Sequence, residues 1–297
     1  MSKEKIPVYD ICSLQDTKGG QDDFLADHFS NYLAKHYSHL HFPHKHSFYH
    51  LVFFTKGKGE HSIDFLTYPV TPLQLYCMIP GQVHSWHFEG RTDGYIINFS
   101  DRFFKSFLLN PHYLEKFSFF SGISSEGVIK IPTASKERII QLLECIVTIA
   151  QKQDVRQHLD KIKVLMLQLF MLLEEEVPPL PAGTVPQQKM LLLKNFRKLI
   201  EEHYKDIKLP KQYAELLYVT PNHLNALCQD LVGKTAGELI RDRVLLEAKR
   251  LLTNANITAA EVAYDLNFQD NSYFSRFFRK YTGQTPETFR KQFDIKK

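Results

Sequence analysis

The sequence is poor in features that mark secreted or membrane proteins. Of its 297 residues only four are cysteines, and none of these pairs as CxxC. Reduced thiols are therefore a simpler interpretation than a disulfide framework. The first ten residues include two lysines but no apolar segment, so no secretory signal is expected. The most apolar stretch, 164–173, is interrupted by Gln168 and is too short to cross a bilayer. We expect a cytoplasmic protein without a membrane segment.

Net charge is low but unevenly distributed. The whole chain has a formal net charge of +4. Residues 190–297 carry 18 lysines and arginines against 13 acidic residues, whereas residues 1–189 carry 19 against 20. A modestly basic C-terminal third suits a surface that contacts phosphates, although this excess alone is weak evidence.

Composition changes along the chain predict four parts and an α+β fold. Residues 1–134 contain short runs of aromatic and β-branched residues separated by glycine and proline turns, which favour an antiparallel β-barrel or sandwich. In 135–177 apolar residues recur at intervals of three and four, which predicts a pair of amphipathic helices. Four prolines and a glycine mark 178–189 as a linker. Residues 190–297 form the fourth part and are expected to be all helical.

The fourth part repeats one layout twice. A short helix, a tight turn and a second helix with a capping residue are predicted from Pro210 and again from Thr258. Gly233 and Gly283 follow the second helix of each unit and are expected to end it. A capping box at Thr235 opens a long helix between the units. This pattern predicts tandem helix-turn-helix units, whose second helices fit the major groove of DNA.

The second unit resembles the C-terminal signature of AraC/XylS-type transcription activators. The similar segment is AEVAYDLNFQDNSYFSRFFRKYTGQTP at 260–286, and the likeness extends over 190–293. The resemblance implies a transcription activator that binds double-stranded DNA, contacts RNA polymerase and dimerises through the helices at 135–177. It also implies that residues near the start of each second helix read bases or contact phosphates. By position these are Asn222, Asn225, Ala226, Gln229, Lys234, Asn271, Ser272, Tyr273, Arg276, Arg279 and Lys280. Family members often carry arginine where this chain has Ala226.

Histidines are concentrated in the N-terminal part, where ten of the 14 fall between His28 and His87. The spacing of His44, His46, His50 and His84 resembles the two metal-binding motifs of cupins, although cupins usually carry glutamate where this chain has His50. Alternate residues of a strand share a face, so the first three can point into one barrel. We expect an effector pocket lined by His44, His46, Phe48, His50, Tyr76, His84, Trp86 and Tyr95.

Three interpretations of the histidines stay open. A sensor barrel would bind a small effector without metal, and no cofactor is then expected. A divalent metal could instead be held by His44, His46, His50 and His84, because imidazole suits transition metals. The residues could also be ordinary strand positions, which is the interpretation we adopt for His61 and the remaining histidines. The leading prediction is an effector-controlled transcription regulator and not an enzyme, and the alternative is a metal-dependent cupin enzyme or metal sensor.

Overall fold

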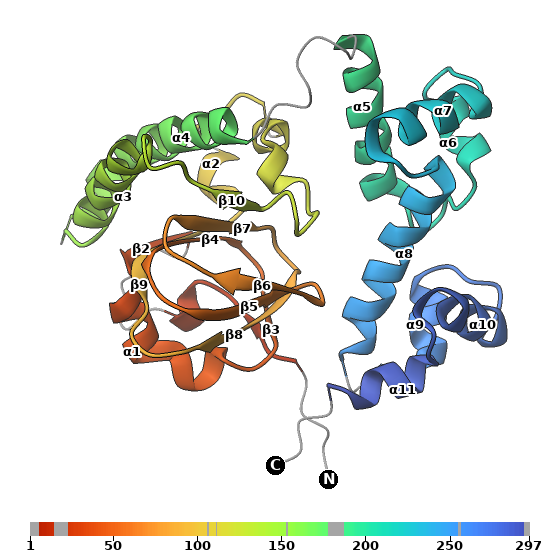
Figure 1. Cartoon of the computed structure of the whole chain (residues 1–297), viewed down its shortest axis with the longest axis horizontal. Coiled ribbons are helices and arrows are strands. Elements are labelled where there is room, and N and C mark those ends of the chain that lie inside the picture. The colour runs from red at the N-terminus through yellow and green to blue at the C-terminus, as the bar shows by residue number, and fades with distance from the viewer. Residues whose placement is uncertain are drawn as a thin grey trace. The chain divides into compact units, whose positions relative to one another are not determined.

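The computed structural model describes residues 6–14, 23–105, 107–110, 112–152, 154–177, 187–254 and 257–293. The chain divides into two compact units, one spanning Pro7–Pro178 and the other comprising Met1–Ile6 with Pro179–Lys297. The first contains all the strands and the second is helical, which confirms the predicted α+β class (Figure 1).

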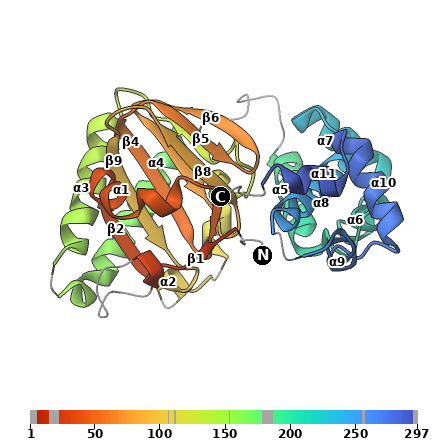
Figure 2. The same cartoon turned by 90° about the horizontal axis from the view of Figure 1, so that it is seen from below.

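Ten strands build the described part of the N-terminal unit as two five-stranded sheets. The first sheet has the order β1-β3-β8-β5-β6 and the second the order β10-β7-β4-β9-β2, and the sheets lie face to face (Figure 2). The strands are β1 Val8–Tyr9, β2 Phe24–His28, β3 His44–His46, β4 Tyr49–Lys56, β5 Gly59–Ile63, β6 Leu66–Val70, β7 Gln74–Met78, β8 Val83–Phe88, β9 Asp93–Phe99 and β10 Val128–Lys130.

Two separate cores follow from the alternation of side chains along the strands. Val52 and Ile96 point into the space between the sheets, where they join a cluster with Trp86. Their neighbours Leu51 and Ile97 point to the opposite face of the second sheet and join a larger cluster. That larger cluster is completed by helices α3, Lys136–Ala150, and α4, Leu159–Glu176.

The helices α3 and α4 confirm the amphipathic pair predicted from the sequence. Helix α1, Phe29–Leu40, was not predicted, and it places Phe29 and Tyr32 against Trp86 in the core between the sheets. A short helix α2, Arg102–Lys105, follows β9. Four short 3-10 turns complete the unit, at Cys12–Leu14, Tyr113–Lys116, Ser118–Phe120 and Val155–His158.

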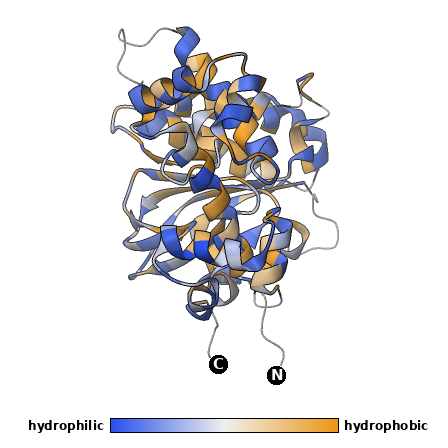
Figure 3. Cartoon of the chain, turned by 90° about the vertical axis from the view of Figure 1, so that its right-hand side faces the viewer, coloured by the Kyte–Doolittle hydropathy of each residue, from blue (hydrophilic) through white to orange (hydrophobic). Residues whose placement is uncertain are grey.

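Seven helices make up the described part of the C-terminal unit. They are α5 Gln187–His203, α6 Pro210–Leu216, α7 Pro221–Val232, α8 Ala236–Leu252, α9 Ala259–Asp265, α10 Asn271–Thr282 and α11 Pro286–Lys291. Hydrophobic and hydrophilic stretches alternate within these helices (Figure 3), as amphipathic packing requires. None of the described helices in either unit has the length and hydropathy needed to cross a bilayer.

The linker prediction falls largely on residues 178–186, which lie outside the described residues. Its last three positions, 187–189, differ from the prediction because they form the first turn of α5. Gln187, Gln188 and Lys189 are good helix formers, so the helix begins as soon as the prolines end.

Candidate functional site

The two helix-turn-helix units have the boundaries that their capping residues predict. The hydroxyl of Thr220 accepts a hydrogen bond from the backbone N–H of His223 and caps α7, and the carboxylate of Asp270 caps α10 by accepting from Tyr273. Gly233 and Gly283 end these helices with φ of 70° and 78°. The turns are alike as well, since Tyr218 and Asn267 occupy equivalent left-handed positions with φ of 56° and 54°.

Most of the residues predicted to contact DNA lie on the exposed faces of α7 and α10. Phe274 and Phe278 anchor α10 to the core, which leaves Arg276 and Arg279 facing outward. Within the described residues the Arg276 guanidinium has no hydrogen bond or ion pair. The exposed members of the predicted set are Asn222, Ala226, Gln229, Lys234, Asn271, Ser272, Tyr273, Arg276, Arg279 and Lys280.

Asn225 differs from the others, because its side-chain oxygen accepts a hydrogen bond of 3.0 Å from the backbone N–H of Ala236. Ala236 is the first residue of α8, where backbone N–H groups have no partner within the helix. The contact joins residues 11 apart in sequence, so helical position alone could not reveal it. This contact gives Asn225 a structural role, and its base-reading role stays a prediction.

Replacing Asn225 with alanine is expected to lower the free energy of unfolding by about 1 kcal/mol, because a buried N–H of α8 loses its acceptor. Asn222→Ala, at an exposed position of the same helix, is the matched control and is expected to leave stability unchanged. Urea unfolding of both variants measures the difference. Equal stability of the two variants, with a change of base preference for Asn225→Ala alone, would restore the base-reading role.

The charge of the two second helices is unequal. Helix α10 carries Arg276, Arg279 and Lys280 and no acidic residue, whereas α7 carries no lysine or arginine and one aspartate. Lys234, just after α7, forms an exposed ion pair of 2.7 Å with Asp242. Such pairs contribute at most about 1 kcal/mol, so Lys234 can exchange its partner for a phosphate at little cost.

The second candidate site is a group of five buried histidines between the sheets of the N-terminal unit. Strand register brings them together: His44 of β3 lies directly opposite His84 of β8, and His61 of β5 lies opposite Trp86. His46 is two residues from His44 on the same face, and its ring centroid is 4.8 Å from that of His50. All five side chains are at most 3% exposed.

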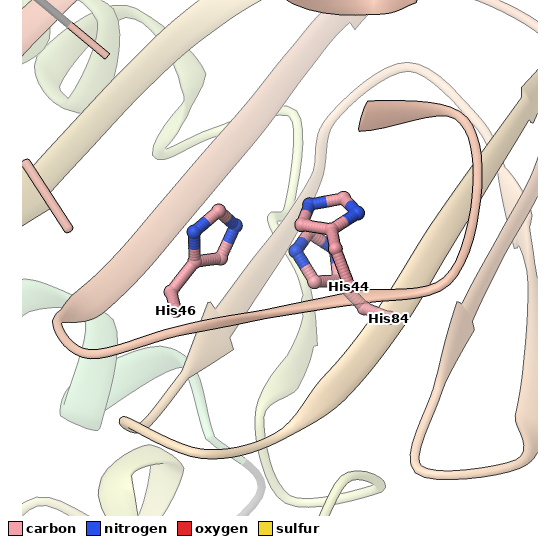
Figure 4. A group of neighbouring side chains, drawn as sticks. All are labelled: His44, His46 and His84. Carbon is pink, nitrogen blue, oxygen red and sulfur yellow. The ribbon is translucent and has the colours of Figure 1, made fainter. Parts of the chain in front are cut away.

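Three of these rings form a compact trio. One ring nitrogen from each of His44, His46 and His84 lies within 4.8 Å of the other two (Figure 4). The Nδ1 of His44 donates to the carbonyl of Phe42 at 2.7 Å, which leaves Nε2 as the atom with a free lone pair. His50 is held in the same way, since its Nδ1 lies 2.7 Å from Oδ1 of Asn98 and its Nε2 is buried without a partner.

Burial keeps these imidazoles neutral at neutral pH. Desolvation lowers the pKa of His44 to about 4 and the pKa of His50 to about 3. It also lowers the pKa of His46, His61 and His84 well below the usual range, and the neighbouring histidines add to this effect. A neutral imidazole offers a lone pair, which is the form that binds metals.

The residues predicted to line an effector pocket lie inside the barrel, with one exception. Phe48 lies beside His46, Tyr76 beside His61, and Trp86 beside His84, with centroid separations of 4.4, 4.7 and 5.1 Å. Tyr95 contradicts the prediction, because it points to the outer face of the second sheet and donates to Glu144 of α3 at 2.9 Å. The neighbouring Ile96 takes the inward position.

Two family models match this chain. One, described as an AraC-like ligand binding domain, matches residues 29–170, and another, described as a helix-turn-helix domain, matches residues 213–292. The chain belongs to the AraC family of transcription regulators. The first match contains the histidine group and the second contains α7 and α10.

Similar proteins are named as HTH-type transcription regulators. An uncharacterized HTH-type transcriptional regulator of Escherichia coli, YijO, is 32% identical over 34% of this chain and 36% of its own length. YfiF of Bacillus subtilis is 22% identical over 89% of this chain and 82% of its own length, and the transcriptional activator RhaR of Cronobacter sakazakii is 22% identical over 84% and 86%. The chain thus matches little more than a third of YijO but most of the other two.

Among solved structures, ToxT of Vibrio cholerae is similar over 92% of this chain and 99% of its own. The sequence identity is 14% and the TM-score is 0.45, which is too low to support an argument about binding.

Sequence reasoning missed two residues of this site, one member of the histidine group and one hydrogen-bond partner of it. His61 was interpreted as an ordinary strand residue, but it is fully buried and its Nε2 lies 3.1 Å from Nδ1 of His84. The alternation of Gly59, His61 and Ile63 along β5 was the available signal, because Ile63 marks the inward face. Asn98 had no such signal, since its role depends on lying opposite His50 in the β4–β9 pair.

Proposed function

We propose that this protein is a sequence-specific DNA-binding transcription regulator, acting as an activator, whose affinity for DNA is controlled by a small effector in the N-terminal barrel. The observation that carries the proposal is the outer face of α10, where Arg276, Arg279 and Lys280 are exposed beside uncharged polar residues. A capped helix with such a face satisfies both requirements of groove recognition, namely phosphate contact and base readout.

We assign different shares of DNA recognition to the two helix-turn-helix units. In the second unit, Arg276 suits guanine and Asn271 suits adenine, with Ser272 and Tyr273 beside them, while Arg279 and Lys280 contact phosphates. In the first unit, Asn222 offers hydrogen bonds and Ala226 a methyl contact, with Gln229 and Lys234 toward the backbone. The first unit therefore supplies less base readout and less charge than the second.

Selection of genomic DNA fragments by the purified full-length chain at physiological salt tests the proposal. We expect a recurring site with two specified blocks about ten base pairs apart, since two helix-turn-helix units on one side of a duplex are separated by about one helical turn. Fragments recovered at random, with no shared site in the presence or absence of cell extract as a source of effector, would contradict it.

Arg276→Ala is expected to weaken binding to the selected site by roughly 1–3 kcal/mol, or about 5- to 150-fold, because a bidentate contact to guanine is lost. Binding to random DNA should change far less. Lys280→Ala is the matched control on the same helix, and it should weaken both kinds of binding alike and lower the salt slope by about one. Fluorescence anisotropy at several salt concentrations measures both; an equal loss on the two DNAs for Arg276→Ala rules out base reading.

Dimerisation and the contact with RNA polymerase are further parts of the proposal. Helix α4 presents Val164, Leu167 and Met171 at intervals of three and four, and Val164 and Met171 are 54% and 46% exposed. This apolar stripe suits a second copy of the same helix. A monomeric mass by light scattering at micromolar concentration would remove dimerisation from the proposal.

A further inference from the structure

The histidine group is built in a way that a simple apolar core does not require. Five imidazoles occupy the space between the sheets, and their ring centroids lie 4.1–5.3 Å from neighbouring members of the group. Nε2 of His44, His50 and His84 and both nitrogens of His46 are buried without a hydrogen-bond partner. A buried nitrogen without a partner is unfavourable because it has lost its hydrogen bonds to water, and a bound ligand would remove that cost.

The orientation of the rings points to the class of ligand. In metal sites a ligating histidine donates its other ring N–H to a carbonyl or carboxylate, which fixes the tautomer and aims the free lone pair. His44 makes that contact with the carbonyl of Phe42, and His50 makes it with Asn98. His84 uses Nδ1 toward His61, so its Nε2 is again the free atom.

We infer that the barrel binds one divalent transition-metal ion through His44, His46 and His84, with His50 adjacent to the trio. That the ion is the effector of the regulator rests on the proposed function. That the ion binds in the barrel does not depend on that function. On one tetrahedral ion three nitrogens stand about 3.4 Å apart. The ring nitrogens of the trio now lie within 4.8 Å of one another. They must therefore approach one another by roughly 1 Å, which small rotations of the rings achieve.

The donor set narrows the choice of ion. All members of the trio are imidazoles, which favour zinc, nickel, cobalt or copper over magnesium and calcium. The rings already pack against Phe48, Tyr76 and Trp86. Because these side chains already fill the interior of the barrel, a single ion fits there better than a sugar or an organic molecule of several rings.

The binding test uses the full chain, stripped with chelator and titrated with Co²⁺, whose visible absorption reports nitrogen ligands, and with Zn²⁺ followed by elemental analysis after gel filtration. We expect one ion per chain. The double variant His44→Ala/His84→Ala should lose affinity by roughly 100-fold or more, whereas His87→Ala should bind like the original chain. His87 is the control because it is exposed on β8, the strand that carries His84.

The results of this metal-binding test can be distinguished from a failure of the proposed function. Absence of stoichiometric metal in the unaltered chain overturns the site, whether or not the double variant folds. Metal that binds with equal affinity to the double variant also overturns it. For the effector role, metal-loaded and metal-free protein should differ at least about fivefold in affinity for the selected DNA site; equal affinity overturns that role. Metal binding without any salt-sensitive DNA binding would support the site and contradict the proposed function instead.

Discussion

Lowering the pH from about 7 to about 5 is expected to destabilise the N-terminal unit of the metal-free protein by roughly 4 kcal/mol from two histidines alone. The pKa of His44 is lowered to about 4 and that of His50 to about 3 in the folded chain. The unfolded chain titrates near 6.5 and thus binds more protons below that pH. Stability is therefore complete above about pH 6.5 and is lost as the pH falls toward the folded pKa values.

The loss is large compared with the stability of a domain, which is about 5–15 kcal/mol in total. His46, His61 and His84 change stability in the same direction, since burial also lowers the pKa of each. We therefore expect the barrel to unfold in mild acid while the helical unit persists. His203 and His223, the histidines of the helical unit, are not buried.

Tryptophan fluorescence during urea unfolding provides the measurement. Trp86 is the only tryptophan of the chain, and it is buried beside His84. Its unfolding midpoint in urea should fall as the pH is lowered from about 6.5 to about 5. His61→Phe should reduce the steepness of the decline. A midpoint that stays constant over this range would mean that the imidazoles are not buried together.

Arg243→Ala is expected to lower the free energy of unfolding of the C-terminal unit by roughly 2–4 kcal/mol. Arg243 lies in the middle of α8 and is 14% exposed. Its guanidinium donates to Glu201 of α5 at 2.8 Å and to Glu247 at 3.0 Å, and it stacks 3.9 Å from the ring centroid of Tyr204. Removing it leaves Glu247, which is 19% exposed, with Arg250 at 3.7 Å as its one remaining ion-pair partner among the described residues.

The matched control is Lys205→Ala, which breaks the exposed 3.0 Å ion pair with Asp265. Exposed pairs of this kind are worth less than about 1 kcal/mol. Urea unfolding followed by circular dichroism compares the two variants, and Arg243→Met separates the charge from the packing of the side-chain stem. If both alanine variants unfold at the same urea concentration, the contacts of Arg243 do not stabilise α8.

The boundaries of the helices were predictable because their signals are local. Thr235 and Glu238 form the capping box of α8. Gly233 ends α7 and Gly283 ends α10. Each of these residues lies within a few residues of the helix end that it defines. Helix α1 escaped prediction because its sequence is rich in aromatics and histidine, which are indifferent helix formers. Its packing on Trp86 stabilises it instead.

The functional sites were only partly predictable, because several side chains depend on contacts distant in sequence. Asn225 occupies a helical position that suits base readout, yet Ala236 of the next helix takes its side-chain oxygen. Tyr95 lies in a continuous apolar run, in which alternation cannot tell the inward from the outward face. The alternation along β5 turns His61 inward, but its contact with His84 depends on the register of β5 with β8.

The unequal charge of α7 and α10 has a consequence for how target sites evolve. A helix that offers Arg276 and Asn271 to base edges, with Ser272 and Tyr273 beside them, demands a defined sequence, whereas a helix with one exposed asparagine and a methyl group tolerates changes in sequence. The block read by α10 should therefore carry most of the information in the operator. A promoter could come under the control of this regulator by acquiring that one block, after which the weaker block would tune the strength of the response.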